Sequence, residues 1–146
     1  MDISASTRAA SGSAGRQKIS AEFAALIAYL AKFNQDKVGL ILFSNQVELH
    51  IPPGSGRGHI WKMIKNTMDA KPQSKGTDIN AALDHFLKIQ KRRTMVFLIS
   101  DFVDVTFGKT LRVMSAKHDV VGIGVEDHRD IEIPNVGMMD LSLIHI

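Results

Sequence analysis

Residues 94–101 read Thr-Met-Val-Phe-Leu-Ile-Ser-Asp, an apolar run that ends in a serine and an aspartate. A continuous apolar stretch of this length is typical of a β-strand that is covered on both faces. Two other runs have the same character, Val-Gly-Leu-Ile-Leu-Phe at 38–43 and the segment 118–125. Because strands buried on both faces occur mainly in parallel sheets, these three segments predict a mostly parallel sheet.

The segments between these strands have helical periodicity. The first, over 17–33, has apolar residues spaced as on one inward-facing side of a helix, namely Ile19, Phe23, Leu26, Ile27 and Leu30. Further helices are predicted at 60–68, at 78–90 and near 107–114. Within the second helix, Trp61 and Met63 are expected to pack inward. Strands that alternate with helices indicate an α/β fold with right-handed crossovers and helices on both faces of the sheet.

An antiparallel edge is predicted next to one of the buried strands. Residues 46–51 alternate apolar and polar side chains, which is typical of a strand with one face in solvent. The short Ser-Asn link at 44–45 makes this strand a hairpin partner of 38–43. Pro52 begins a turn that is expected to end the strand. A weak last strand is predicted over 136–139, after a proline loop.

The composition predicts a single soluble domain. The chain has 146 residues, of which 45% are hydrophobic, enough for one buried core. No apolar run approaches the roughly 20 residues of a membrane-spanning helix, and the beginning of the chain lacks a basic segment followed by an apolar signal core. We therefore expect a cytoplasmic protein with no membrane segment in this stretch.

Several site chemistries are excluded or disfavoured by the residue types. The sequence has no cysteine, which excludes disulfides, thiolate zinc sites and cysteine nucleophiles. Its six histidines are dispersed without the pair spacing of a metal site. The net charge of +3 is mildly basic, and the densest cluster, 88–93, falls at an expected helix end, where cations complement the helix dipole. Without interleaved aromatic residues this cluster does not predict nucleic-acid binding.

Three separated segments carry oxygen ligands. The first contributes Asp2, Ser4 and Ser6 in a D-x-S-x-S pattern, the second contributes Thr77 ahead of a helix, and the third contributes Asp101 at the end of a buried strand. Mg²⁺ favours octahedral coordination by carboxylates, hydroxyls and water, and Mn²⁺ or Ca²⁺ accept related oxygen sets. In open α/β sheets, ligands bind beyond the carboxyl ends of the strands, so we expect these side chains to share that rim. A partner's carboxylate would take a remaining coordination position.

Each segment also has an ordinary structural explanation. Residues 2–15 are rich in Ser, Ala and Gly and could form a flexible leader. Thr77 or Asp78 could cap the following helix, and Asp101 could be a turn residue. Asp104 could add a further acid near the site, but we expect it to be an exposed turn residue. The combination of all three segments in this order favours the metal site over these explanations.

The chain resembles a von Willebrand factor A domain that carries a metal-ion-dependent adhesion site, and the resemblance spans about residues 2–140. Four runs are similar to bacterial proteins of the domain of unknown function 58 family: VGLILFSNQVELHIPP at 38–53, GRGH at 56–59, GTDINAAL at 76–83 and LISDFVD at 98–104. The resemblance implies a Rossmann-like von Willebrand factor A fold, with one partial domain over 1–140. Its sheet would be mostly parallel with one antiparallel edge strand.

The same resemblance implies a role for each candidate ligand. Ser4, Ser6 and Thr77 would bind the cation through hydroxyls, while Asp2 and Asp101 would act directly or through water. Family members are typically encoded beside MoxR-type AAA+ ATPases. We therefore expect a non-enzymatic, metal-dependent protein-interaction module that works with such an ATPase in protein maturation or complex assembly. No nucleic acid is expected as a partner.

Two other function classes stay open. A Mg²⁺-dependent phosphoryl-transfer enzyme could use Asp2 as its nucleophile, since Mg²⁺ flanked by carboxylates at strand ends also serves that chemistry. Against it, serine stands where such an enzyme needs a second acid two residues on, and no lysine occupies an obvious electrophilic position. A nucleotide-binding or receiver-like module would need a phosphate loop, and the sequence has no GxxxxGK[ST] pattern.

The two ends of the chain suggest a fragment. Residues 141–146, Leu-Ser-Leu-Ile-His-Ile, resemble the translation of a sequencing adapter and are excluded from the fold. The family sheet has a central first strand that delivers the aspartate, and here it is reduced to Met1, so we expect that strand to be missing. Unpaired backbone groups on its two neighbours would each cost roughly 1 to 3 kcal/mol, and we predict low stability for this chain.

Overall fold

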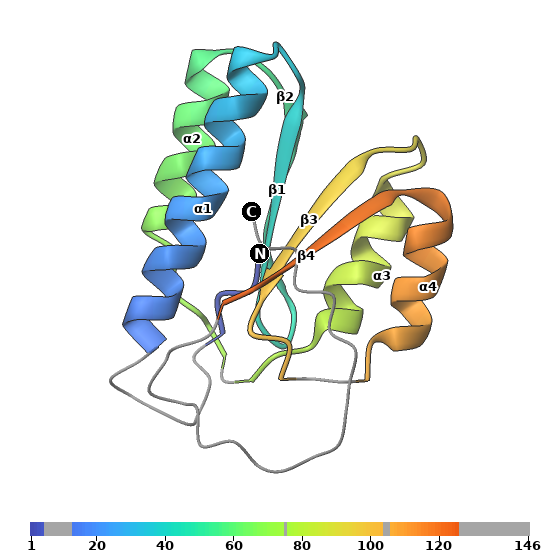
Figure 1. Ribbon diagram of the computed structural model, residues 1–146. Coiled ribbons are helices and arrows are strands. Elements are labelled where there is room, and N and C mark those ends of the chain that lie inside the picture. Colours follow the sequence, from blue (N-terminus) through green and yellow to red (C-terminus); the bar gives the residue numbers. More distant parts are fainter. Residues whose placement is uncertain (5–12, 75, 104–105, 126–146) are drawn as a thin grey trace.

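The computed structural model describes residues 1–4, 13–74, 76–103 and 106–125 (Figure 1). Within them the elements follow in the order α1 (Ser13–Phe33), β1 (Val38–Phe43), β2 (Val47–Gly54), α2 (Arg57–Met68), α3 (Ile79–Ile89), β3 (Met95–Ser100), α4 (Gly108–Lys117) and β4 (Asp119–Gly124). The predicted mixture of helices and strands is therefore confirmed. The predicted strand at 136–139 and the tail at 141–146 lie outside the described residues.

The predicted hairpin is present, and its second strand is longer than expected. β1 and β2 pair antiparallel, and the pairing continues to Val38 opposite Gly54. The strand therefore runs through two prolines that the sequence suggested would end it. Proline is tolerated in an edge strand because its missing N–H is not needed there. At Gly39 a Cβ atom would lie 2.9 Å from the Ile51 carbonyl oxygen, so only glycine fits where the two backbones close on each other.

A second pair of strands is parallel, as predicted, but β4 is not buried on both faces as expected, since its residues are all exposed or half-buried. β3 and β4 pair in register from Met95 opposite Asp119 to Ser100 opposite Gly124. At the start of β4, the Arg93 guanidinium donates hydrogen bonds to both carboxylate oxygens of Asp119, at 3.2 and 2.6 Å. The parallel pair therefore begins with a two-point ion pair on the molecular surface.

Residues 1–3 join the two pairs of strands. On one side, the Ile3 amide donates to the Phe43 carbonyl at 2.8 Å, and the Phe43 amide donates to the Met1 carbonyl at 3.1 Å. On the other side, the Asp2 amide donates to the Ile99 carbonyl at 2.8 Å. The beginning of the chain therefore lies between the carboxyl ends of β1 and β3, where Figure 1 marks the N-terminus.

The helices form two layers, with α1 and α2 on one side of the strands and α3 and α4 on the other (Figure 1). Each layer covers its own hydrophobic cluster. The α1–α2 cluster includes Ala21, Ala28, Leu40, Leu42, Ile60, Met63 and Ile99. The α3–α4 cluster includes Phe43, Ile79, Leu83, Leu98 and Met114. Since adjacent strand residues such as Leu42 and Phe43 enter different clusters, β1 is covered on both faces.

The inward face of α1 differs from the prediction. Leu26 is 51% exposed, and Ile19 and Leu30 are exposed to a similar degree. The buried positions are instead Ala21 and Ala28, the latter only 1% exposed, with Phe23 and Ile27 partly buried beside them. Because alanine side chains are small, they let this helix approach its neighbours closely. The side of α1 that carries Ala21 and Ala28 therefore faces the core.

The α2 helix corrects a second expectation. Met63 is buried as predicted, but Trp61 is 61% exposed. Trp61 lies one position from the buried Ile60, and one helical step rotates a side chain by about 100°, which turns the indole away from the core. Among the described residues, no helix combines the length and the apolar character needed to cross a lipid bilayer.

Candidate metal centre

The predicted ligands Ser4 and Thr77 meet, although they come from different parts of the chain. Their two hydroxyl groups are hydrogen-bonded to each other. Ser4 follows Ile3, which is paired with the last residue of β1, Phe43. Thr77 precedes Asp78, whose amide donates to the Ser44 carbonyl at 2.9 Å. The end of β1 therefore places both hydroxyls at the same point of the rim.

Asp2 is held in a defined orientation beside them. The Ser4 amide donates to Oδ1 of Asp2 at 2.8 Å, and the hydroxyl of Ser100 donates to Oδ2 at 2.7 Å. Ser100 is buried at the end of β3. Its role was not assigned from the sequence, where the only signal is a serine directly before Asp101.

Asp101 shares a small cavity with the N-terminal ligands. The cavity has a volume of about 30 Å³, and its lining includes Asp2, Ser4, Ser100 and Asp101. A cavity needs at least about 10 to 15 Å³ of such volume to hold one water molecule. The predicted rim therefore contains a space large enough for a water molecule or a small ion.

The backbone after Asp101 adopts an unusual conformation. Phe102 has φ of 52°, in the left-handed region that few residues with a side chain adopt. Its amide donates to the Ser100 hydroxyl at 3.2 Å. Its ring lies against β4, since a Cβ atom at Gly122 would be 3.4 Å from the ring. This turn directs the chain away from β3 immediately after the aspartate, as strained positions at functional sites often do.

The cavity is lined by two acids, Asp2 and Asp101, and by one cationic side chain, Arg16. The pKa of Asp2 is raised from its ordinary value, mainly by burial and to a smaller extent by the nearby charge of Asp101. The hydrogen bonds from Ser4 and Ser100 oppose this rise. Two carboxyl groups that share a small, partly buried space repel each other when both are ionised, and a bound cation would remove that penalty. The residues present therefore fit a divalent ion chemically.

Of the five predicted ligands, Asp2, Ser4 and Asp101 line the small cavity, whereas Thr77 is not part of the lining and contacts the site through its hydrogen bond to Ser4. The fifth, Ser6, lies outside the described residues, as does Asp104. The donor set depends on hydroxyls as well as acids, because the described part of the chain has no cluster of three or more His, Cys, Asp or Glu side chains suited to a metal ion.

Asp78 has the structural role that was considered for this segment. Its side chain accepts a hydrogen bond from the Ala81 amide at 3.1 Å, and it is the N-cap of α3. The cap satisfies one of the unpaired amides at the start of the helix. Thr77, one residue earlier, is thus left to face Ser4 with its hydroxyl.

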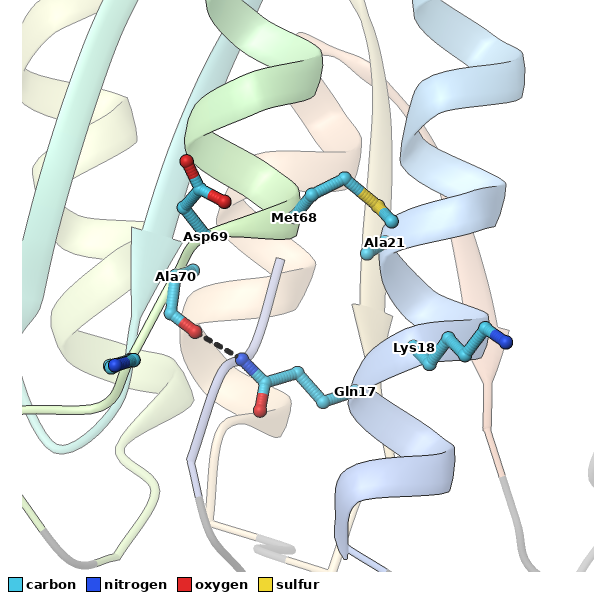
Figure 2. A pocket seen from close by; sticks show the side chains of 7 residues that line it. Gln17, Lys18, Ala21, Met68, Asp69 and Ala70 are labelled. Atoms are coloured by element: carbon cyan, nitrogen blue, oxygen red, sulfur yellow. Dashed lines mark hydrogen bonds between the residues drawn. The ribbon is translucent and has the colours of Figure 1, made fainter.

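A larger pocket adjoins the small cavity along α1. It has a volume of about 550 Å³ and lies between the first turns of α1 and the end of α2. Figure 2 shows the Gln17 side chain reaching across from α1, where its amide nitrogen donates to the Ala70 carbonyl, and Met68 extending toward Ala21. Gln17 also lines the small cavity, together with Arg16, so the two spaces are neighbours.

Comparison with known proteins gives relatives of unknown activity. An uncharacterized protein of Mycobacterium tuberculosis and one of Mycobacterium bovis are each 29% identical to this chain over 140 residues, which cover 94% of the chain and 44% of each relative. An uncharacterized protein of Mycobacterium avium is 31% identical over 90 residues, covering 60% of the chain and 53% of that protein. The chain thus spans about half the length of the curated relatives that it matches.

No solved structure gives a significant match to the chain. A family match covers nearly its whole length, from residue 1 to residue 143. The chain therefore belongs to the family described as Protein of unknown function DUF58.

Proposed function

We propose that this domain is a metal-dependent protein-interaction module. Mg²⁺ would be held by Asp2, Ser4, Ser6, Thr77 and Asp101, with Mn²⁺ or Ca²⁺ as substitutes. The ion would supply an unquenched positive charge to which an Asp or Glu side chain of a partner binds. The domain's own residues orient the ion and leave a position for that carboxylate.

One observation carries the proposal: three predicted oxygen donors, Asp2, Ser4 and Asp101, line one small cavity, and a fourth, Thr77, is hydrogen-bonded to Ser4. Asp2 and Ser4 precede the first helix, Thr77 precedes α3, and Asp101 follows β3. The donors are hard oxygens, which suit Mg²⁺, Mn²⁺ and Ca²⁺ better than softer metals. Burial, and to a smaller extent the charge of Asp101, raises the pKa of Asp2, and a bound cation would oppose both effects.

The arrangement of strands supports the proposal that the domain has a Rossmann-like von Willebrand factor A fold. Hydrogen bonds connect β2 to β1, β1 to residues 1–3, residues 1–3 to β3, and β3 to β4. The only antiparallel contact in that described series is the β1–β2 hairpin. Helices cover both faces (Figure 1). We infer a partner in a MoxR-type AAA+ ATPase system from the family resemblance.

Metal binding can be tested by thermal unfolding and calorimetric titration. Mg²⁺ is expected to stabilise the folded chain by about 2.7 kcal/mol when free Mg²⁺ reaches 100 times the Kd. Asp101→Asn should remove this effect. Asp84→Asn is a matched control, because Asp84 is an exposed residue on α3. No stabilisation of the unaltered chain by Mg²⁺, Mn²⁺ or Ca²⁺ would contradict the proposal.

The interaction itself requires a second measurement. A MoxR-type ATPase from the same genome should bind the chain in the presence of Mg²⁺ and dissociate when the ion is chelated. The same samples should be assayed with a generic phosphate ester. Hydrolysis that disappears in both Asp2→Asn and Asp101→Asn would instead support a phosphoryl-transfer enzyme.

A further inference from the structure

The turn between β1 and β2 is bonded to the loop that carries Thr77. We call this group of side chains the Ser44 cluster, and its members are Ser44, Asn45, Glu48, Gln73 and Ser74. The Ser44 hydroxyl donates to Glu48 and is hydrogen-bonded to the Ser74 hydroxyl at 2.9 Å. The Ser74 hydroxyl is also hydrogen-bonded to the side-chain amide of Asn45. Three side chains from the hairpin thus meet the loop between α2 and α3.

Glu48 makes the most extensive contact with that loop. The Gln73 amide donates to both of its side-chain oxygens, at 3.0 and 3.1 Å. Hydrogen bonds to a carboxylate are stronger than bonds between neutral groups. Glu48 therefore contacts the loop through the Gln73 backbone amide and, within the hairpin, accepts the hydrogen bond of Ser44.

Ser44 connects this cluster to the candidate metal centre. It is fully buried, with 0% exposure, so its polar groups need partners inside the protein. Its carbonyl accepts the Asp78 amide at 2.9 Å, and Asp78 directly follows Thr77. The residue before Ser44, Phe43, is bonded to Ile3 at 2.8 Å, directly before Ser4. Ser44 is therefore hydrogen-bonded to the segment that carries Thr77, and its chain neighbour Phe43 is hydrogen-bonded to the segment that carries Ser4.

We propose that Glu48 and Ser44 are positioning residues of the cation site, which hold the loop 69–78 so that the Thr77 hydroxyl stays against that of Ser4. This inference rests on the proposed metal-binding function. Neither residue touches the small cavity, whose described lining includes no member of the Ser44 cluster. Partners of this kind commonly change metal affinity by 10- to 100-fold when they are removed, because they orient the ligands.

The test uses Mn²⁺ as the probe, with its electron paramagnetic resonance signal reporting the free ion. Glu48→Ala should weaken Mn²⁺ binding about tenfold. Glu48→Gln should recover most of the affinity, because the carboxamide oxygen still accepts from Ser44 or Gln73. Glu22→Ala is the matched control, since it removes an equal charge from an exposed side chain of α1 and should leave the Kd unchanged.

Amide hydrogen exchange of the same variants separates positioning from general stability. In Glu48→Ala the amides of Gln73 and Asp78 should exchange faster, while amides within β3 keep their protection. If Glu48→Ala fails to fold, Ser74→Ala provides the milder variant, with a loss of affinity that is smaller than tenfold and in the same direction.

Two results would overturn the inference in distinguishable ways. If the unaltered chain binds Mn²⁺ and Glu48→Ala binds it equally well, the Ser44 cluster has only a structural role and the proposed function stands. If the unaltered chain binds no divalent ion, the proposed function fails and the positioning role fails with it. If Glu48→Ala and Glu22→Ala lower the Mn²⁺ affinity equally, the change in net charge explains the effect, and the inference is also overturned.

Discussion

The hydroxyls of Ser4 and Thr77 are hydrogen-bonded to each other across 73 positions of sequence. The contact exists because Ile3 pairs with Phe43 and Asp78 bonds to Ser44, so two successive residues of one strand end control both segments. The protein's own hydrogen bonds thus bring these two oxygen donors together. Preorganised donors of this kind reduce the ordering that a bound ion would otherwise have to impose.

Replacing Thr77 by valine tests this contact most directly. Valine has nearly the same shape but no hydroxyl, so Ser4 loses its partner and the ion loses a donor. Removing groups that only orient metal ligands lowers affinity by about 10- to 100-fold, so we expect Mg²⁺ affinity to fall by at least about tenfold. Thr77→Ser, which retains the hydroxyl, should bind nearly as well. If calorimetry gives the same Kd for Thr77→Val and the unaltered chain, Thr77 is not a ligand of the ion.

Phe102 should contribute to stability through its ring and to strain through its backbone. Because the half-buried ring packs against β4, Phe102→Ala should lower the free energy of unfolding by about 2 kcal/mol, somewhat less than for a fully buried phenylalanine. Phe102→Gly loses the same ring but tolerates φ of 52°. Glycine should therefore be more stable than alanine here by about 1 kcal/mol. Urea unfolding can measure both, and an alanine variant at least as stable as glycine would contradict the strain argument.

The packed stripe of α1 can be tested with one substitution on each side of the helix. Ala28 is 1% exposed, so Ala28→Leu would overfill the core and should destabilise the fold by about 1 to 3 kcal/mol. Leu26 is half exposed, and Leu26→Lys should change stability by only about 0.5 kcal/mol. If urea unfolding shows that Leu26→Lys destabilises the fold more than Ala28→Leu, the inward face is the one predicted from the apolar spacing.

Stability should depend on pH through His118. Burial, followed by the charges of Lys117 and Arg93, lowers the pKa of this side chain, and its ring lies 4.9 Å from that of Phe86. Folding therefore disfavours the protonated form. The unfolded chain takes up a proton near the ordinary value of about 6.5, so stability is complete above that pH and falls as the pH decreases below it.

The urea midpoint at pH 5.5 should accordingly be lower than at pH 7.5, and the difference should be smaller in His118→Leu. His50 contributes in the same direction, because burial and the neighbouring His85 also lower its pKa. A His118→Leu variant with an unchanged difference between the two pH values would assign the pH dependence to other groups.

Local sequence patterns were sufficient for the strands and for most of the helices. The apolar runs at 38–43 and 94–100 are strands, because a run of that length can be buried on both faces. The orientation of α1 could not be predicted in the same way. Ile19, Leu26 and Leu30 of this helix are exposed, whereas Phe23 and Ile27 pack with Ala21 and Ala28, and periodicity alone does not say which of these sides faces the core.

The candidate ligands could also be found from sequence, but their supports could not. Asp2 opens the D-x-S-x-S pattern, and Asp101 directly follows an apolar strand. Ser100 orients Asp2 across 98 positions, and Ser44 meets Ser74 across 30. Such contacts depend on which strand ends become neighbours in space, and no local pattern specifies that.

The three residues that open the chain form a seam between the β1–β2 hairpin and the β3–β4 pair. The small cavity lies at this seam, with Asp2 and Ser4 on the joining segment and Asp101 at the end of β3. Any occupant that contacts these groups would connect the opening segment, which is hydrogen-bonded to both strand pairs, to the end of β3. Binding at the cavity and the hydrogen bonding of residues 1–3 would then be thermodynamically linked. A mutation that weakens these hydrogen bonds should therefore lower the affinity for the occupant, even where it changes no coordinating atom.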